Sequence, residues 1–352
     1  MTERSVALLQ ELVEIESPTG DTAAIRDRLA LELAALGADV TPAGDHLRAR
    51  LAGRDRPLLL LGHFDTVWPR GTLSRLPWRV VHGNAYGPGS YDMKGGLVVM
   101  LDAIRRSGTE HELRVVLTAD EEVGSPTAHQ LLAEGARGAA AAFVCEPPTA
   151  SGDLKTARKG IGRFELHVRG SPAHSAHRHE GVSAIDELAR LIVRLNELND
   201  PTRGVTLNVG VIAGGTRENV VAAEASALVD VRVPTIAQRD RLDAVLRALR
   251  PEADVELDLR GSWTRPPLER SPGGAKLAAR AREHGRELGL DLGEAAVSGG
   301  SDGNLVGALG VPVLDGLGAE GGGAHADDEH VVIASLDVRA ELLARLLREP
   351  GI

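Results

Sequence analysis

Hydrophobic positions in the first 158 residues follow helical and strand patterns in alternation. The segment 21–37 predicts a helix whose apolar face is formed by Ile25, Leu29, Leu33 and Leu36. Gly37 stands where a helix commonly ends. Three short apolar runs predict buried strands at 57–62, 113–119 and 140–146. This alternation indicates an α/β domain with a central mixed sheet flanked by helices.

The pattern changes after residue 158. GRFELHVRG (162–170) alternates apolar and polar residues, as a strand with one buried face does. Helical patterns near 181–199 and 236–249 and three further strand patterns give the order β-α-β-β-α-β, which is the ferredoxin-like motif. We therefore expect an inserted domain at 159–263. Residues 1–158 and 264–352 would form the first domain, completed by a helix near 272–289 and a strand at 311–316.

Composition narrows the class of protein. The chain has 352 residues, a suitable length for two domains, and 43% of them are hydrophobic. A net charge of −10 and an aromatic content of 2% argue against a nucleic-acid partner. No stretch approaches the ~18 apolar residues of a membrane span. The first residues lack the basic and apolar regions of a signal peptide, so we expect a cytoplasmic protein without a membrane partner.

Acidic and histidine residues follow the predicted strands. They form five separated clusters: His63-Phe64-Asp65, Asp92 in YGPGSYDMKGG, Asp120-Glu121-Glu122, Glu146, and His325 in GGGAHADDEH. Each alone has an ordinary explanation as a strand end, a turn or a solvated loop. Because ligands bind outside the carboxyl ends of strands in α/β sheets, the five together indicate one shared site.

The residue types indicate a centre for two divalent metal ions. We expect His63, Asp92 and Glu146 to bind one ion, and Asp92, Glu122 and His325 to bind the other. The charge of the three carboxylates and a bridging hydroxide would balance two divalent ions. Nitrogen and oxygen ligands suit two Zn²⁺, with Co²⁺ or Mn²⁺ as substitutes. Such a centre activates water for hydrolysis. Glu121 would be the general base. Asp65 would orient the metal ligands without binding a metal ion itself.

Four of these motifs resemble those of a known group of enzymes. They are HxDTV at 63–67, GPGxxDMKGG at 87–96, the Glu pair at 121–122 and Glu-Pro at 146–147. The sequence is similar to the dizinc metallopeptidase superfamily of glutamate carboxypeptidases, aminoacylases, acetylornithine deacetylases and succinyl-diaminopimelate desuccinylases. It looks closest to the glutamate carboxypeptidase (carboxypeptidase G type) branch. The resemblance implies metals in the first domain and a homodimer formed through the inserted lid domain.

The resemblance also implies further site residues. His174 matches a lid histidine that stabilises the oxyanion, from its own subunit or from the partner. Asn219 and Arg232 match positions near the substrate carboxylate, although a surface ion pair is the alternative for Arg232. The proposed substrate loop consists of Gly299, Gly300 and Ser301, continuing to Asp302, with an ordinary turn as the alternative. The segment AHSAHRHEG departs from the usual lid motif through the additional His177 and His179.

These observations predict a zinc-dependent hydrolase that cleaves the amide bond between an acyl group and an amino acid with a free carboxylate. Glutamate is the amino acid that the resemblance favours. An N-acyl-amino-acid deacylase of the acetylornithine deacetylase type and a dipeptidase are the nearest alternatives. An aminopeptidase would need an acid for the substrate amine, such as Asp302 or Glu320. A non-catalytic metal-binding scaffold is the alternative from another class of protein.

Overall fold

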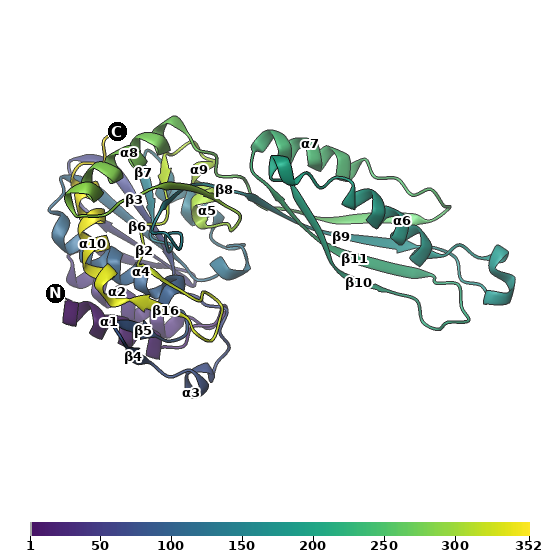
Figure 1. Cartoon of the computed structure of the whole chain (residues 1–352), viewed down its shortest axis with the longest axis horizontal. Helices are drawn as coiled ribbons and strands as arrows, with labels where there is room; N and C mark the ends of the chain where they lie inside the picture. Colours follow the sequence, from purple (N-terminus) through teal and green to yellow (C-terminus); the bar gives the residue numbers. More distant parts are fainter. Residues whose placement is uncertain (1) are drawn as a thin grey trace. The chain divides into compact units, whose positions relative to one another are not determined.

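The computed structural model describes residues 2–352, which fall into two compact units. Unit 1 comprises residues 1–157, 270–297 and 301–352, and unit 2 comprises residues 158–269 and 298–300. Figure 1 shows both units, and each is described by itself below. Among the described residues, none of the helices is long and apolar enough to cross a membrane.

A six-stranded sheet forms the centre of unit 1 (Figure 1). The strands occur in the order β1 (Asp39–Ala43), β2 (His46–Leu51), β6 (His111–Thr118), β3 (Asp55–His63), β7 (Ala141–Val144) and β14 (Val313–Leu314). The strands β6, β3, β7 and β14 pair in parallel, whereas β2 pairs antiparallel with both of its neighbours, β1 and β6. Leu58 to Leu61 of β3 are fully buried, because a parallel strand is covered on both faces.

Helices flank the central sheet of unit 1. The helices of this unit are α1 (Thr2–Glu14), α2 (Ala23–Ala35), α3 (Thr72–Arg75), α4 (Gly95–Ser107), α5 (His129–Ala136), α8 (Pro272–Glu287), α9 (Asp302–Gly307) and α10 (Ile333–Arg348). Helix α4 packs against α10, while α5 packs against α9 (Figure 1). The mixed sheet flanked by helices confirms the predicted fold class. Helix α2 buries Ile25, Leu29 and Leu33, as its apolar pattern predicts.

Two small sheets of unit 1 have no clear signal in the sequence. One has the order β15 (Gly321–Gly322), β16 (His330–Val332), β5 (Asn84–Tyr86) and β4 (Arg79–Val81), and the other pairs β13 (Glu294–Val297) with β8 (Leu154–Arg158). Strands of two or three residues are too short to show a periodic pattern. Pairing of β16 with β5 brings the segment after residue 86 next to the segment before residue 330.

Unit 2 contains β9 (Gly160–Arg169), α6 (Ala184–Asn196), β10 (Thr206–Gly214), β11 (Glu224–Val233), α7 (Ile236–Arg247) and β12 (Glu256–Arg265). Its antiparallel sheet has the order β10-β11-β9-β12. This is the β-α-β-β-α-β order that the sequence predicts. Helix α6 begins later than the predicted residue 181, because the Ser183 hydroxyl caps it by accepting a hydrogen bond from the Asp186 amide.

The core of unit 2 lies between its sheet and its helices. The alternating residues Phe164, Leu166 and Val168 of β9 are buried together with Leu188 and Leu191 of α6. The strand period of two and the helix period of 3.6 thus place both apolar faces against each other. Whether this unit acts as a lid stays a prediction.

Candidate metal centre

Three neighbouring parallel strands of unit 1 carry the first candidate ligands at their carboxyl ends. His63 is the last residue of β3. Glu121 and Glu122 follow β6, and Glu146 follows β7. Strand β3 lies between β6 and β7, so the three ends meet at one edge of the sheet. This is the position at which open α/β sheets bind their ligands.

Asp92 lies between two histidines. One of its oxygens, Oδ1, is 3.3 Å from His63 Nε2, which is also 3.3 Å from Glu146 Oε1. The other oxygen, Oδ2, is 3.3 Å from His325 Nε2, which is 3.3 Å from Glu122 Oε2. We call His63, Asp92 and Glu146 the first donor set, and Asp92, Glu122 and His325 the second donor set.

The spacing of these atoms fits metal coordination. In a tetrahedral zinc site with bonds of ~2.0–2.1 Å, neighbouring ligand atoms lie ~3.3 Å apart. The ligand atoms of His63, Asp92 and Glu122 lie within 4.8 Å of one another, and so do those of His63, Glu121 and Glu146. Together with the four distances of 3.3 Å around Asp92, this spacing fits two adjacent divalent ions that share Asp92.

The charges at the site favour a cation. Burial lowers the pKa of His63, but its hydrogen bonds with Asp65, Asp92 and Glu146 outweigh burial and raise this pKa well above its usual value. Hydrogen bonds with Asp92 and Glu122 raise the pKa of His325 to about 10. The two imidazoles in turn lower the pKa of Asp92 despite its burial. A field that favours protons on two imidazoles also favours metal ions in their place.

Asp65 holds several of these residues in position. Its carboxylate is fully buried and accepts hydrogen bonds from the backbone amides of Glu121 (3.1 Å) and Glu122 (3.2 Å). The Thr19 hydroxyl donates to the same carboxylate at 2.7 Å. Nδ1 of His63 lies 3.0 Å from the backbone oxygen of Asp65, which leaves Nε2 directed at Asp92 and Glu146. Asp65 therefore acts on the centre by orienting other residues.

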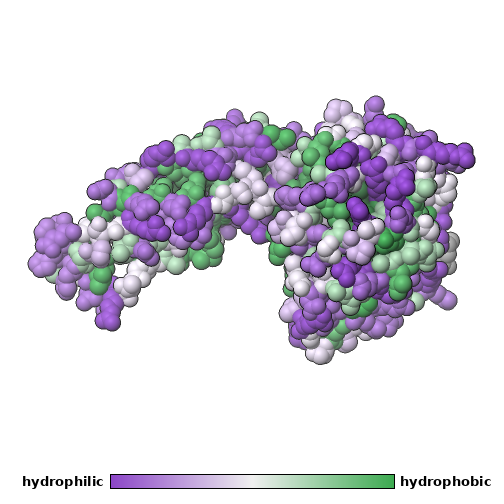
Figure 2. All heavy atoms as spheres, turned by 180° about the vertical axis from the view of Figure 1, so that it is seen from behind, coloured by the Kyte–Doolittle hydropathy of each residue, from purple (hydrophilic) through white to green (hydrophobic). Residues whose placement is uncertain are grey.

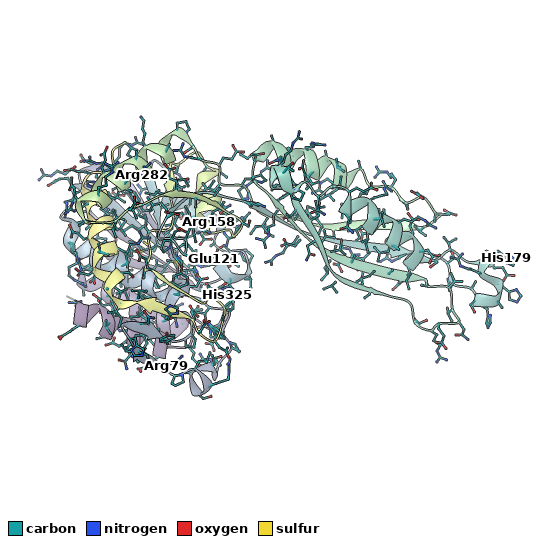
Figure 3. The ribbon with its side chains drawn as sticks, in the orientation of Figure 1. Arg79, Glu121, Arg158, His179, Arg282 and His325 are labelled. Carbon is teal, nitrogen blue, oxygen red and sulfur yellow. The ribbon has the colours of Figure 1, made fainter. Side chains whose placement is uncertain are left out.

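Glu121 lies beside the first donor set, with a carboxylate oxygen within 4.8 Å of ligand atoms of His63 and Glu146. It begins the short helical turn η2 (Glu121–Val123), and its side chain is partly exposed. Figure 3 labels Glu121 and His325 in unit 1. A carboxylate next to the ligands that is still open to solvent can reach a water molecule bound between them. This position suits a general base.

Two features fix the loop that carries Asp92. The first is Gly89, which has a φ of 69°; a Cβ at this position would lie 2.5 Å from the Thr66 methyl group, so the turn requires glycine. The second is Glu329, which the sequence does not single out. The buried carboxylate of Glu329 accepts hydrogen bonds from three backbone amides of the same loop. In the sequence Glu329 belongs to the acidic run DDEH, which looks like an exposed surface segment.

His174 and Asn219 lie together in unit 2, and both are exposed. His174 precedes the helical turn η3 (Ser175–Glu180), and its Nδ1 accepts a hydrogen bond from the Ala176 amide. The Ser175 amide donates to the Asn219 carbonyl at 3.0 Å. His179, labelled in Figure 3, belongs to the same turn. The contacts of His174 and Asn219 with substrate stay predictions.

Arg232 and the glycine loop make contacts within unit 2. The Arg232 guanidinium donates to both oxygens of Asp230, at 2.7 and 3.1 Å, and to the Ser298 carbonyl at 3.2 Å. Arg232 thus forms an ion pair, which from the sequence was the alternative to binding the substrate carboxylate. The Gly299 and Gly300 carbonyls accept hydrogen bonds from the Arg158 guanidinium.

Ser301 and Asp302 form the start of α9 inside unit 1. The Ser301 side chain is fully buried, donates to Asp315 at 2.6 Å and caps the helix through the Gly303 amide. The buried carboxylate of Asp302 accepts hydrogen bonds from Thr118 and Ser125. These contacts explain both residues as parts of the fold. A substrate contact of Ser301 stays a prediction.

Comparisons with known proteins identify the family of this chain. Residues 59–349 match Peptidase family M20/M25/M40. Carboxypeptidase G2 from Pseudomonas sp. (strain RS-16) is 33% identical over 98% of this chain and 89% of its own length. Succinyl-diaminopimelate desuccinylase from Thioalkalivibrio sulfidiphilus is 27% identical over 97% of each chain. The structure of aminopeptidase PepT from Bacillus cereus superposes with a TM-score of 0.83, covering 100% of this chain and 99% of that one at 21% identity, and so shares the fold. The chain belongs to Peptidase family M20/M25/M40 and is a hydrolytic enzyme of the metallopeptidase and amidohydrolase type.

Proposed function

We propose that this enzyme uses a two-metal centre to hydrolyse the amide bond between an acyl group and an amino acid with a free carboxylate, with glutamate as the amino acid. The observation that carries the proposal is the position of Asp92, which directs one oxygen to each donor set at 3.3 Å from a histidine. Two divalent ions bound there would lower the pKa of water and polarise the amide carbonyl.

We propose zinc as the natural metal. The donors are two imidazole nitrogens and carboxylate oxygens, which is the set that suits Zn²⁺ and admits Co²⁺ or Mn²⁺. Cys145 precedes Glu146, but it is fully buried and burial raises the pKa of its thiol. A thiol that stays protonated is a poor ligand.

The residues of the chain have distinct roles in the proposed reaction. Glu121 takes a proton from the attacking water, whose oxygen bonds to the carbonyl carbon. When the C–N bond breaks, Glu121 returns this proton to the leaving amine nitrogen. Asp65 keeps Glu121 beside the first donor set through the backbone hydrogen bond at 3.1 Å. His174 would stabilise the negative charge on the carbonyl oxygen.

Glutamate as the released amino acid is supported by the similarity to carboxypeptidase G2 along nearly the whole chain. Asn219 and Arg232 are the residues that we propose for the substrate carboxylate, with Gly299, Gly300 and Ser301 in the neighbouring loop. To bind the substrate carboxylate, Arg232 would have to break one of its two hydrogen bonds with Asp230. A bidentate guanidinium is well suited to such an exchange between carboxylates.

A deacylase is the second candidate, because succinyl-diaminopimelate desuccinylase matches 97% of this chain. The centre would perform the same reaction on an N-acyl amino acid or, in a dipeptidase, on a dipeptide. The carboxypeptidase, the deacylase and the dipeptidase would differ in the part of the substrate that unit 2 and the substrate loop bind.

We also propose a cytoplasmic homodimer that forms through unit 2. Strand β10 lies at the edge of its sheet and exposes Val211 and Ile212, with Leu228 exposed on the neighbouring strand β11. Figure 2 shows hydrophobic side chains among the hydrophilic ones on the visible surface of this unit. An edge strand with apolar side chains can pair with the same strand of a second copy.

A hydrolysis panel tests the substrate proposal. The zinc-loaded enzyme is incubated with folyl-type acyl glutamates, N-acetyl amino acids and plain dipeptides, and the products are identified by mass spectrometry. We expect free glutamate from the first group. Cleavage confined to the other groups would replace the carboxypeptidase assignment with a deacylase or a dipeptidase, and Glu121→Gln serves as the inactive control in each reaction.

A further inference from the structure

Glu329 has its carboxylate buried against the Asp92 loop, with a side chain exposure of only 3%. Oε1 accepts hydrogen bonds from the backbone amides of Tyr91 and Asp92, both at 3.0 Å. Oε2 accepts hydrogen bonds from the Gly89 amide and from Nε1 of Trp68, both at 2.8 Å. The four donors surround both oxygens, so the carboxylate fixes the backbone of the loop in one arrangement.

Glu329 also contacts the turn that follows His325, the histidine of the second donor set. The Glu329 amide donates to the Ala326 carbonyl at 3.0 Å and closes a turn directly after His325. One amino acid therefore holds the backbone amide of Asp92 with its side chain and the turn after His325 with its main chain. Asp92 and Glu329 are 237 residues apart in the sequence.

The two donor sets differ in their other supports. In the first donor set, His63 and Glu146 follow strands of the central sheet. In the second donor set, Glu122 is held through Asp65, whereas His325 lies on an exposed loop and has a φ of 62°. The position of His325 relative to Asp92 thus depends on the turn that contains Glu329.

We propose that Glu329 is a positioning residue that sets the distance between Asp92 and His325 and thereby favours the binding of the metal ion in the second donor set. The inference rests on the two-metal centre proposed above. Residues behind metal ligands commonly change metal affinity ~10–100-fold when they are substituted. A residue that only stabilised the fold would lower the affinity for both ions alike.

The test is a titration of the metal-free protein with Zn²⁺ in competition with a chromophoric chelator. His325→Ala identifies which of the two binding steps belongs to the second donor set. We expect Glu329→Gln to weaken that step ~10–100-fold and to change the other step much less. The exposed neighbour Asp328 provides the matched control, because Asp328→Asn removes one charge from the same turn and should leave both steps unchanged.

Glu329→Asp keeps the charge but is too short to reach all four donors, so it should show the same selective loss if the Gln variant does not fold. Thermal unfolding of each metal-free variant is measured in parallel. Equal weakening of both steps, or no weakening of either, would overturn the inference. If the unchanged protein binds fewer than two ions, the two-metal proposal itself fails, which separates the two results.

Discussion

Hydrogen-bonded carboxylates determine the chemistry at the scale of single residues. Asp92 directs one oxygen to each histidine, Asp65 holds the amides of Glu121 and Glu122, and Glu329 holds the Asp92 loop. Each of these carboxylates has a defined partner, so their charges orient other groups. Glu121 is the residue that we assign to proton transfer itself.

Glu121→Gln should lower kcat/KM by about 100-fold or more, because a glutamine cannot take a proton from water. The zinc content should stay unchanged, since Glu121 is not in either donor set. Steady-state kinetics and metal analysis of the same sample check both statements. The exposed Glu110→Gln provides a charge-matched control that should keep full activity. A variant with normal turnover would remove Glu121 from the mechanism.

The stability that His63 and His325 contribute to the metal-free enzyme should be lost as the pH rises from about 7 to about 10. The folded state raises the pKa of His63, and that of His325 to about 10, so it binds more protons than the unfolded state in this range. Stability from such groups is complete below the unfolded pKa and is lost as the pH rises through the folded one. Thermal unfolding in a chelator measures the change of stability with pH, and the unchanged protein should lose more stability over this range than His325→Asn does. Equal changes in the two proteins would contradict the prediction.

The members of the two donor sets were singled out from the sequence and lie together in the structure, whereas the supporting residue Glu329 was not singled out. His63, Glu122 and Glu146 follow apolar runs, so the end of each predicted strand located them. Glu329 gave no such signal, because its partners are backbone amides 237 to 240 residues away. Ser301 differs from Glu329, because the sequence singled it out as a substrate-binding residue. The glycine-rich sequence around Ser301 does not reveal that this serine is a buried helix cap.

At the scale of elements, close packing between α4 and the end of β7 places Glu146. A Cβ on Gly96 would lie 1.9 Å from the backbone oxygen of Cys145, the residue before Glu146. Glycine is therefore needed where the helix begins. The short strands β15, β16, β5 and β4 position another candidate ligand, Asp92. Their pairing holds the Asp92 loop near the turn that contains Glu329.

Gly96→Ala should destabilise the protein by about 1–3 kcal/mol, because the methyl group forces α4 away from the Cys145 carbonyl. Displacement of Glu146 should also weaken zinc binding by the first donor set. Denaturant unfolding and the zinc titration measure the two effects. Gly210→Ala is the control, since its Cβ would meet its nearest neighbour at 3.4 Å, and a comparable loss there would remove the packing explanation.

At the scale of the whole molecule, the metal centre is contained in unit 1, whereas His174, Asn219 and Arg232 belong to unit 2. Each unit has a hydrophobic core of its own, so the donor sets and these three residues are positioned by different cores. In unit 2 the order of strands and helices followed from the apolar pattern, whereas in unit 1 the pattern predicted β3, β6, β7 and β14 but not β1 and β2. The short sheets and the contacts of residues 298–300 with unit 2 depend on tertiary packing and had no local signal.

Ile212→Lys on the edge strand β10 should shift the protein from a dimer to a monomer of 37.1 kDa, because it places a charge in the proposed apolar interface. Light scattering at micromolar concentration measures the mass. Val80→Lys exposes a comparable charge on β4 of unit 1 and should leave the dimer intact. A monomeric mass for the unchanged protein would contradict assembly through unit 2.

The number of zinc ions bound per chain distinguishes a two-metal centre from a single-ion site. The metal-free protein is loaded with zinc, separated from the excess by gel filtration and analysed for metal and protein content. Because Asp92 directs one oxygen to each histidine, we expect two zinc ions per chain. A value of one or none would contradict a shared two-metal centre.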